Sequence, residues 1–161
     1  MNPRFACVIV AGIALAFLAT GCQQPKAEQA LGTEDTATIG KMLDSMIAAY
    51  AAKDLDKSMA DVDPDIVNME YDKCYRGAVE FREKHLKPEM ANYTVQTYKA
   101  EDRHILGRGS FAYVNEREIC RFTDNSGKQL GSDSYWASYV LEKKSDGRWK
   151  IVQSHFSGPA S

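Results

Sequence analysis

The segment DGRWKIVQSHFSG, residues 146–158, decides how the fold is interpreted. Asp146 and Gly147 form a turn signal that is typical of a hairpin between two antiparallel strands. Beyond this turn, Trp149 and Ile151 are separated by polar residues, as expected for a strand with one buried face. The segment therefore predicts a closing strand over residues 148–157 that pairs with the strand before it.

The same alternation extends upstream to Tyr93, where the period of apolar residues changes from 3.6 to 2. Segments rich in Gly, Asp, Asn and Ser divide this region at places where tight turns are favoured. We therefore expect three further strands, over residues 94–106, 110–123 and 132–143.

The first part of the domain has a helical pattern. Apolar residues recur at helical spacing over residues 36–52, which predicts an amphipathic helix. A short helix over 55–62, a strand over 66–71 and a third helix over 77–90 follow, with Pro88 straining the last of these. Helices followed by an antiparallel meander indicate an α+β fold, with the helices on one face of a curved sheet.

Residues 1–22, MNPRFACVIVAGIALAFLATGC, resemble a bacterial lipoprotein signal. Arg4 supplies the positive charge, and the apolar run over residues 5–18 is too short for a stable membrane span. The small residues 19–21 precede Cys22, as in a lipobox. The resemblance implies that residues 1–21 are removed and that Cys22 is acylated. An ordinary secretory signal and an uncleaved anchor are the alternatives.

Residues 22–35 are mostly polar and are expected to form a flexible tether between the lipid and the domain. Gln23 follows the cysteine, whereas an Asp there would resemble an inner-membrane retention signal. We therefore expect a cell-envelope protein on the outer membrane that faces the periplasm. Its contact with the membrane would be through the acyl anchor alone.

Charge and motifs exclude several classes of function. The formal net charge is −2, with 20 basic and 22 acidic residues, so nucleic acid is not an expected partner. The sequence contains no Walker loop, GxGxxG, HExxH or CxxC motif. We accordingly predict no cofactor and no metal site.

Two cysteines, Cys74 and Cys120, remain within the expected domain. In an oxidising compartment they are candidates for a disulfide, which would close about 46 residues and add roughly 4 kcal/mol of stability. Two unpaired thiols are the alternative, because the sequence alone does not bring the Cα atoms within bonding range.

Three segments carry a resemblance to the nuclear transport factor 2-like superfamily. They are AAYAAKDLDKSMADVDPDIVNMEY at residues 48–71, the Tyr75-Arg76-Gly77 step, and the closing residues 146–158. The last is similar to the end of SnoaL-like domains and of the calcium/calmodulin-dependent kinase II association domain. The resemblance covers residues 36–158. It implies a cone-shaped, curved antiparallel sheet wrapped by three N-terminal helices, with an internal pocket and a homodimer across the outer sheet face.

Glu70 is the first candidate catalytic residue. Counted from the shared turn, it stands where the ketosteroid isomerase branch has its aspartate base. A carboxylate in an apolar cone can have a raised pKa and move protons next to a carbonyl group. The oxyanion donors of that branch are missing, since Met46 replaces the tyrosine and residues 138–140 contain no Asp. A rim carboxylate in a salt bridge or in solvent is the alternative.

His155 is the second candidate. SnoaL-like and kinase-association domains often have a histidine at this position, where an imidazole could bind a ligand or act as a base. Alternation places it on the same face as Trp149 and Ile151. Gln153 occupies a position where these families often have another histidine. The alternative is a hydrogen-bonded histidine near the end of a strand.

Polar and aromatic residues on the strands could bind a ligand. Asn115 occupies the place of a deep arginine in the kinase-association branch, and Arg117 and Arg121 could turn towards an anion unless they form a solvated face. The strand aromatics could line the cone, or form the core or the dimer face. The alternation does not say which face is inside. The predicted ligand-binding set is Tyr71, Tyr113, Asn115, Arg117, Trp136, Gln153 and His155.

Three functions are consistent with these observations. The preferred one is a domain that binds a small molecule in the cone pocket without catalysis. The second is an enzyme of proton-transfer or hydrolytic type, which requires Glu70 and His155 to point into one cavity. The third is an envelope scaffold dimer with its pocket filled by aromatic side chains.

Overall fold

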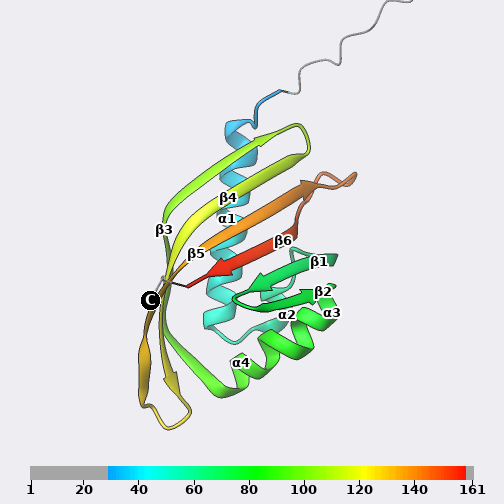
Figure 1. The fold of residues 1–161 in the computed structure, drawn as a ribbon. Coiled ribbons are helices and arrows are strands. Elements are labelled where there is room, and N and C mark those ends of the chain that lie inside the picture. Colours follow the sequence, from blue (N-terminus) through cyan, green and yellow to red (C-terminus); the bar gives the residue numbers. More distant parts are fainter. Residues whose placement is uncertain (1–28, 159–161) are drawn as a thin grey trace, which may run out of the picture.

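Six strands form one curved sheet in the computed structural model, which describes residues 29–158 (Figure 1). The strand order is β2-β1-β6-β5-β4-β3. The strands are β1 (Val62–Glu70), β2 (Lys73–Arg76), β3 (Tyr93–Arg108), β4 (Phe111–Asp124), β5 (Gln129–Lys143) and β6 (Trp149–Ser157).

The sheet confirms the predicted α+β class and the four-strand meander, and adds one parallel pair. β3, β4, β5 and β6 pair antiparallel in succession, but β1 and β6 run parallel. The sheet is therefore mixed rather than wholly antiparallel. β1 is placed next to the last strand of the chain, which brings its C-terminal end into contact with the end of β6.

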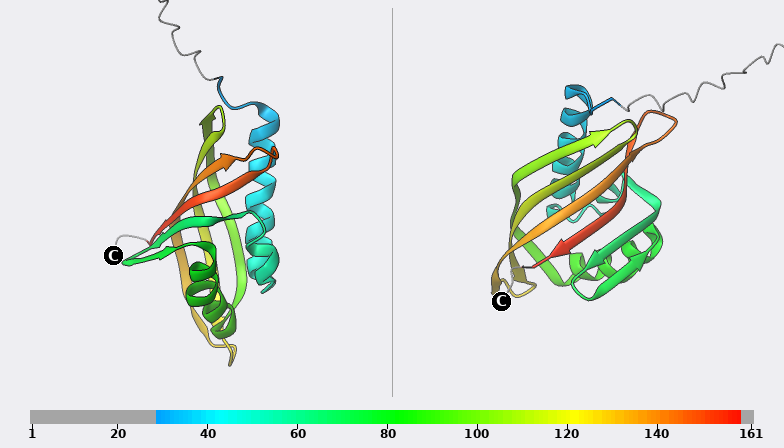
Figure 2. Two further views of the ribbon diagram at one scale, coloured as in Figure 1. Left: turned by 90° about the vertical axis from the view of Figure 1, so that its right-hand side faces the viewer. Right: turned by 45° about the horizontal axis from the view of Figure 1, so that its top comes forward.

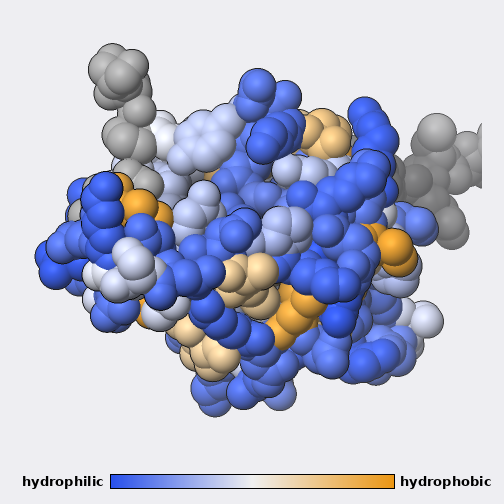
Figure 3. Space-filling view, turned by 90° about the horizontal axis from the view of Figure 1, so that it is seen from below, coloured by the Kyte–Doolittle hydropathy of each residue, from blue (hydrophilic) through white to orange (hydrophobic). Residues whose placement is uncertain are grey.

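Three helical segments accompany the sheet: α1 (Thr33–Ala51), α2 (Leu55–Ser58) and a continuous segment over residues 78–92. The apolar stripe of α1 buries Ile39, Leu43 and Ile47. α1 runs along one face of the sheet, and the 78–92 segment lies by β1 and β2 at one end of it (Figures 1 and 2). Seen from that end, the surface is mainly hydrophilic, with small apolar areas (Figure 3).

The 78–92 segment is helical throughout but changes its winding. It comprises α3 (Ala78–Phe81), the π-helical turn η1 (Arg82–Leu86) and α4 (Lys87–Asn92). Pro88 lacks an N–H and would crowd the carbonyl group four residues earlier in a regular α-helix. The wider turn, in which the Lys87 N–H donates to the Arg82 carbonyl oxygen, precedes this proline. The predicted strain is thus accommodated as a π-turn.

β2 was not expected from the sequence. Its residues Lys73–Arg76 are short and mostly polar, so they give little periodic signal. The strand forms a hairpin with β1 in which Glu70 pairs with Lys73 across a turn. Tyr71 in that turn has a positive φ of 51°. The hairpin holds Glu70 at the very end of β1.

The first helix begins earlier than the helix predicted over residues 36–52. α1 begins at Thr33, and Ala30 forms a β-bridge with Arg108. The expected signal sequence, Cys22 and the first part of the tether lie outside the described residues. Over residues 29–158, no helix combines the length and hydropathy that a membrane crossing requires.

The predicted disulfide is wrong: Cys74 and Cys120 are not bonded to each other. Cys74 is exposed on β2, whereas Cys120 is buried on β4. Three strands, β1, β6 and β5, lie between them in the sheet. Neighbouring strands are spaced by about 4.8 Å and a disulfide needs Cα atoms within about 7 Å, so this arrangement keeps the two thiols apart.

One face of the sheet packs against α1 and forms the core. The inward side chains on β4 and β5 include Val114, Tyr139 and Leu141, which are almost completely buried and pack with Ile39 and Leu43 of α1. The face turned away from α1, which we call the outer face, exposes about half of each large side chain in the set Phe111, Tyr113 and Trp136.

Two carboxylates are buried deep on the inner face. Glu116 and Glu118 of β4 are 0% exposed. Glu116 pairs with Arg103, whose guanidinium also lies 2.8 Å from Asp44 of α1. The hydroxyl groups of Tyr98 and Tyr139 donate to Glu118, the latter at 2.6 Å. Burial raises the pKa of Glu118 to about 8, from an ordinary value of 4.5.

This shift predicts a pH dependence of stability. Between pH 4.5 and 8, folded Glu118 keeps a proton that the unfolded chain has lost, so the free energy of unfolding should fall as pH rises. The expected contribution is about 1.4 kcal/mol per pH unit in that window. In urea denaturation from pH 5 to 9, Glu118→Gln should flatten this slope. Exposed Glu34→Gln is the control, and an unchanged slope in Glu118→Gln would contradict the assignment.

Candidate functional site

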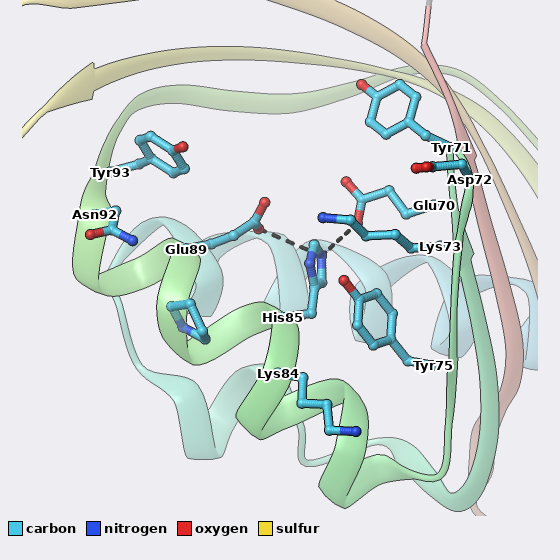
Figure 4. Close-up of a pocket in the computed structure, with 11 residues that line it drawn as sticks. Glu70, Tyr71, Asp72, Lys73, Tyr75, Lys84, His85, Glu89, Asn92 and Tyr93 are labelled. Carbon is cyan, nitrogen blue, oxygen red and sulfur yellow. Dashed lines mark ion pairs between the residues drawn. The ribbon is translucent and has the colours of Figure 1, made fainter.

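A pocket of about 410 Å³ opens between the β1–β2 hairpin and the 78–92 segment (Figure 4). Both walls carry charged and aromatic side chains that point towards the space between them. The lining residues are Glu70, Tyr71, Asp72, Lys73, Tyr75, Lys84, His85, Pro88, Glu89, Asn92 and Tyr93.

Glu70, His85 and Glu89 form the polar centre of this pocket. The Nε2 atom of His85 lies 2.5 Å from an Oε2 atom of Glu70 and 3.6 Å from Oε2 of Glu89. Glu70 comes from the end of β1, whereas His85 and Glu89 are four residues apart on the helical segment. The imidazole therefore links the sheet to the helix and lies between two carboxylates.

Aromatic rings hold the imidazole in place. The His85 ring stacks on Tyr75 of β2 at a centroid distance of 5.0 Å and on Phe81 of α3 at 5.4 Å. Tyr75 and Phe81 are both buried. Because the rings of Tyr75 and Phe81 both stack on it, the His85 side chain has little rotational freedom. Its Nε2 atom therefore stays directed towards the two carboxylates.

Tyr50 of α1 completes the centre. Its hydroxyl group donates to Oε2 of Glu89 at 2.8 Å, and its ring meets Tyr98 edge-on at 5.6 Å. Burial raises the pKa of Tyr50, and the negative charge of Glu89 adds to the shift. The tyrosine therefore stays neutral and acts as a donor that fixes one carboxylate oxygen.

Burial also shifts the pKa values of Glu89 and His85, which are in contact with each other. It raises the pKa of Glu89, against the opposing effect of His85. For His85, burial alone would lower the pKa, but the hydrogen bond with Glu70 and the charge of Glu89 outweigh it, and the pKa lies above its ordinary value. The centre thus holds an imidazole that favours its charged form beside two acidic groups.

The carboxylates also face a second recess of about 400 Å³, whose walls are more aromatic. Its lining residues are Glu70, Tyr71, Glu89, Tyr93, Phe122, Leu130 and Tyr135. Glu70 and Glu89 border both spaces, so they lie where the polar pocket and the aromatic recess meet. A molecule that entered from either side would contact at least one carboxylate.

Most of the predicted ligand-binding residues lie elsewhere. Tyr71, one member of that set, lines the pocket together with Glu70, the predicted catalytic carboxylate. Tyr113 and Trp136 are exposed on the outer face, where Asn115 accepts a hydrogen bond from Ser138. The alternation along β4 and β5 agrees with the sequence pattern, and the structure supplies what the pattern left open: the face with Tyr113 and Trp136 is the outer one. The outer-face residues of the predicted set are Tyr113, Asn115, Arg117, Trp136, Gln153 and His155.

The predicted arginines do not enter the pocket. Arg117 has its Nη2 atom 2.7 Å from Glu101 of β3, so it takes part in an ion pair between adjacent strands. Arg121 lies four residues further along β4, on the exposed side of the strand. Both arginines therefore lie on a solvated face of the sheet, which was the alternative to an anion site.

His155 is separated from Glu70 by an irregularity in β6. The register with β5 shifts between Ile151 and Gln153, so alternation does not continue across Val152. Ile151 is buried, whereas Gln153 and His155 are both exposed. Glu70 pairs with Phe156 in the parallel ladder. The structure therefore does not bring Glu70 and His155 into one cavity, as the enzyme hypothesis required.

The sequence interpretation missed His85, Glu89 and Tyr50. A signal was present in HLKPE, residues 85–89, because residues four apart on a helix share one face. The proline within it indicated strain rather than a site. Tyr50 falls within the amphipathic helix predicted over residues 36–52, and that pattern accounts for its ring but not for its hydroxyl group.

Comparison with known proteins gives a consistent result. Residues 39–161 match the SnoaL-like domain family. No match was found among the curated proteins.

Three solved structures illustrate the similarity in fold. A nuclear transport factor 2-like superfamily protein from Salmonella enterica has a TM-score of 0.70 at 18% identity, covering 76% of this chain and 89% of its own. A ketosteroid isomerase-like protein from Erwinia carotovora atroseptica has a TM-score of 0.69 at 17% identity, covering 81% and 100%. The CaMKII hub of S. rosetta has a TM-score of 0.62 at 21% identity, covering 76% and 95%.

The contact between Tyr50 and Glu89 can be tested by removing one oxygen atom. Tyr50→Phe keeps the ring but leaves a partly buried carboxylate without its tyrosine donor, so it should lower the free energy of unfolding by about 1–2 kcal/mol. Urea denaturation at pH 7 measures the change. Tyr113→Phe, at a half-exposed tyrosine on the outer face, is the matched control and should change stability by less than about 0.5 kcal/mol. Equal effects in the two variants would contradict a specific role for Tyr50.

Proposed function

The chain belongs to the SnoaL-like domain family, and we propose that it uses the fold to bind a small organic molecule at the Glu70–His85–Glu89 centre without transforming it. The observation that carries this proposal is the pair of spaces, of about 410 and 400 Å³, that meet at Glu70 and Glu89. Ligand pockets of proteins fall in this size range and combine apolar walls with a few fixed polar groups.

The lining of the pocket suggests how such a molecule would lie. Tyr71 and Tyr93 are both exposed and line both spaces, so their rings are available to an apolar, flat part of the ligand. Glu70 and Glu89 would receive its hydrogen-bond donors. Each carboxylate is already oriented by a protein partner, His85 or Tyr50, which favours fixed recognition.

A second candidate function is proton transfer. The observation in its favour is the contact between the Glu70 carboxylate and His85 Nε2 at the edge of an open pocket. Such a pair can accept a proton at one group and hold it at the other. In this alternative Glu70 would act with His85. If the bound molecule were converted on incubation with the protein, this function would replace simple binding.

Pairing of two copies is part of the proposal. The outer face exposes Phe111, Tyr113 and Trp136, and large exposed apolar side chains that share one sheet face are common at subunit contacts. We infer a homodimer across this face, which would leave the pocket on the other side of each sheet accessible.

We also infer that the protein is exported and attached to the outer membrane, facing the periplasm. The support is the lipobox-like sequence that ends at Cys22. Two or three acyl chains hold a protein on a bilayer much more firmly than one, because each buried methylene contributes about 0.8 kcal/mol. The chain between Cys22 and α1 would link the lipid to the domain.

Native mass spectrometry of the protein purified from its host tests ligand binding and dimer formation together. We expect a dimer that carries a small-molecule adduct. Tyr93→Ala, at the pocket wall, should weaken binding about fivefold and lose most of the adduct, because the ring contact is worth about 1 kcal/mol. Tyr113→Ala, at a tyrosine of similar exposure on the outer face, should retain it. An adduct that is lost in Tyr113→Ala and retained in Tyr93→Ala would contradict the proposed site.

Lipid attachment has a separate test. When the full chain is expressed in bacteria fed a radiolabelled fatty acid, it should take up the label and sediment with membranes. Cys22→Ala should abolish both, whereas Cys74→Ala, at an exposed cysteine of the domain, should change neither. A wild-type chain that remains unlabelled would contradict acylation at Cys22.

A further inference from the structure

We propose that Glu70, His85 and Glu89 bind a divalent metal ion, and that Zn²⁺ is the ion that suits them best. Each residue offers one donor atom, and these atoms lie within 4.8 Å of one another. Within residues 29–158, this is the one group of three such side chains that meets that distance. Imidazole nitrogen and carboxylate oxygen are both ligand types that zinc takes in proteins, and zinc sites with three protein ligands keep a fourth position open.

The three donors are presented by two ordered elements rather than by a loop. His85 and Glu89 are four residues apart on the helical segment, so their side chains project from the same face. Glu70 reaches the same point from the end of β1. Figure 4 shows the three side chains directed towards one another, with the imidazole in the middle.

Neighbouring groups orient the donors in the way that metal sites require. Tyr75 and Phe81 stack on the imidazole and fix the direction of its ring. The Tyr50 hydroxyl group holds Oε2 of Glu89 by a 2.8 Å hydrogen bond. Groups that fix the first ligands in this manner increase the metal affinity of a site by 10-fold to about 100-fold.

The two distances from His85 require only a small adjustment. Zinc lies about 2.0–2.2 Å from nitrogen and oxygen ligands, which places tetrahedral ligands roughly 3.3 Å apart. His85 Nε2 is 3.6 Å from Glu89, close to that separation. Its 2.5 Å contact with Glu70 is shorter, because a proton lies between the two groups. Metal binding would release this proton and widen the contact by less than about 1 Å.

The charge and the open side of the centre favour an ion. Two carboxylates and a neutral imidazole carry a charge of −2 in all, which a divalent ion offsets. Two lysines also line the pocket: Lys84 is paired with Glu80 at 2.7 Å, and Lys73 is adjacent to Asp72 in the sequence. The fourth coordination position would face the pocket and would be open to water or to an oxygen or nitrogen donor of a ligand. Metal binding does not depend on the organic ligand proposed above.

Isothermal titration calorimetry of the full chain, stripped of metal with a chelator, tests this site with Zn²⁺ alone. We expect one ion per chain. His85→Asn and Glu89→Gln should each weaken binding at least about tenfold. His155→Asn, at an exposed position, and Glu80→Gln, at a partly exposed position paired with Lys84, alter the same residue types outside this centre and should leave the affinity unchanged. Circular dichroism of each variant shows whether a loss of binding reflects a loss of fold.

Two outcomes would overturn the proposal. The first is the absence of Zn²⁺ binding to the folded wild-type chain. The second is binding that persists in folded His85→Asn and Glu89→Gln but disappears in Cys74→Ser, which would assign the ion to a cysteine. A Co²⁺ titration adds an independent measurement, because the absorption spectrum of the bound ion distinguishes nitrogen and oxygen ligands from thiolate.

Discussion

The carboxylates on the inner side of the sheet have to be neutralised, and the arrangement of the surrounding elements depends on this constraint. An ionised group removed from water without a partner costs several kcal/mol. Glu116 is paired with Arg103, and Glu118 is bonded to two tyrosines. Nearer the open end, Glu70 and Glu89 share His85. Arg103 and the two tyrosines come from strands other than β4, and His85 reaches Glu70 from the helical segment, so these polar contacts join separate elements of the fold.

The two acidic clusters differ in access, and this difference indicates which one can have a function. Glu116 and Glu118 are 0% exposed and surrounded by core residues. Glu70 and Glu89 keep part of their surface accessible and border two spaces of about 400 Å³. The deep cluster is therefore part of the packing of β4 against α1 and β3. The cluster of Glu70, His85 and Glu89 combines charged side chains in contact with one another and adjoining space for a ligand or an ion.

The sequence predicted the elements of this fold better than it predicted the site. Periodicity identified α1, the strand that became β1, and the four strands of the meander, because each buries one face over many residues. It could not say which face is inside the cone, so the candidate ligand-binding set included Tyr113 and Trp136, which lie on the outer face. The irregularity at Val152 places His155 on the opposite face of β6 from Ile151, whereas simple alternation predicted the same face. Such irregularities have no simple sequence signal.

The site itself depends on long-range contacts. β2 has a short, polar sequence that becomes a strand only by pairing with β1. His85 meets Glu70 because the π-turn before Pro88 and the β1–β2 hairpin bring the two elements together. Tyr50 was recognised as an apolar position of a helix, but its partner Glu89 lies 39 residues away. Of this site, the sequence pointed to Glu70 through the family resemblance, and it contained the four-residue spacing of His85 and Glu89.

A crystal structure of the protein purified from its host, without added ligand or chelator, would test the central claim most directly. The account predicts electron density that does not belong to the protein at the Glu70–His85–Glu89 centre, from an ion, an organic molecule or both. An inner pocket filled by its own side chains, with bound material only on the outer face near Trp136 and His155, would contradict it.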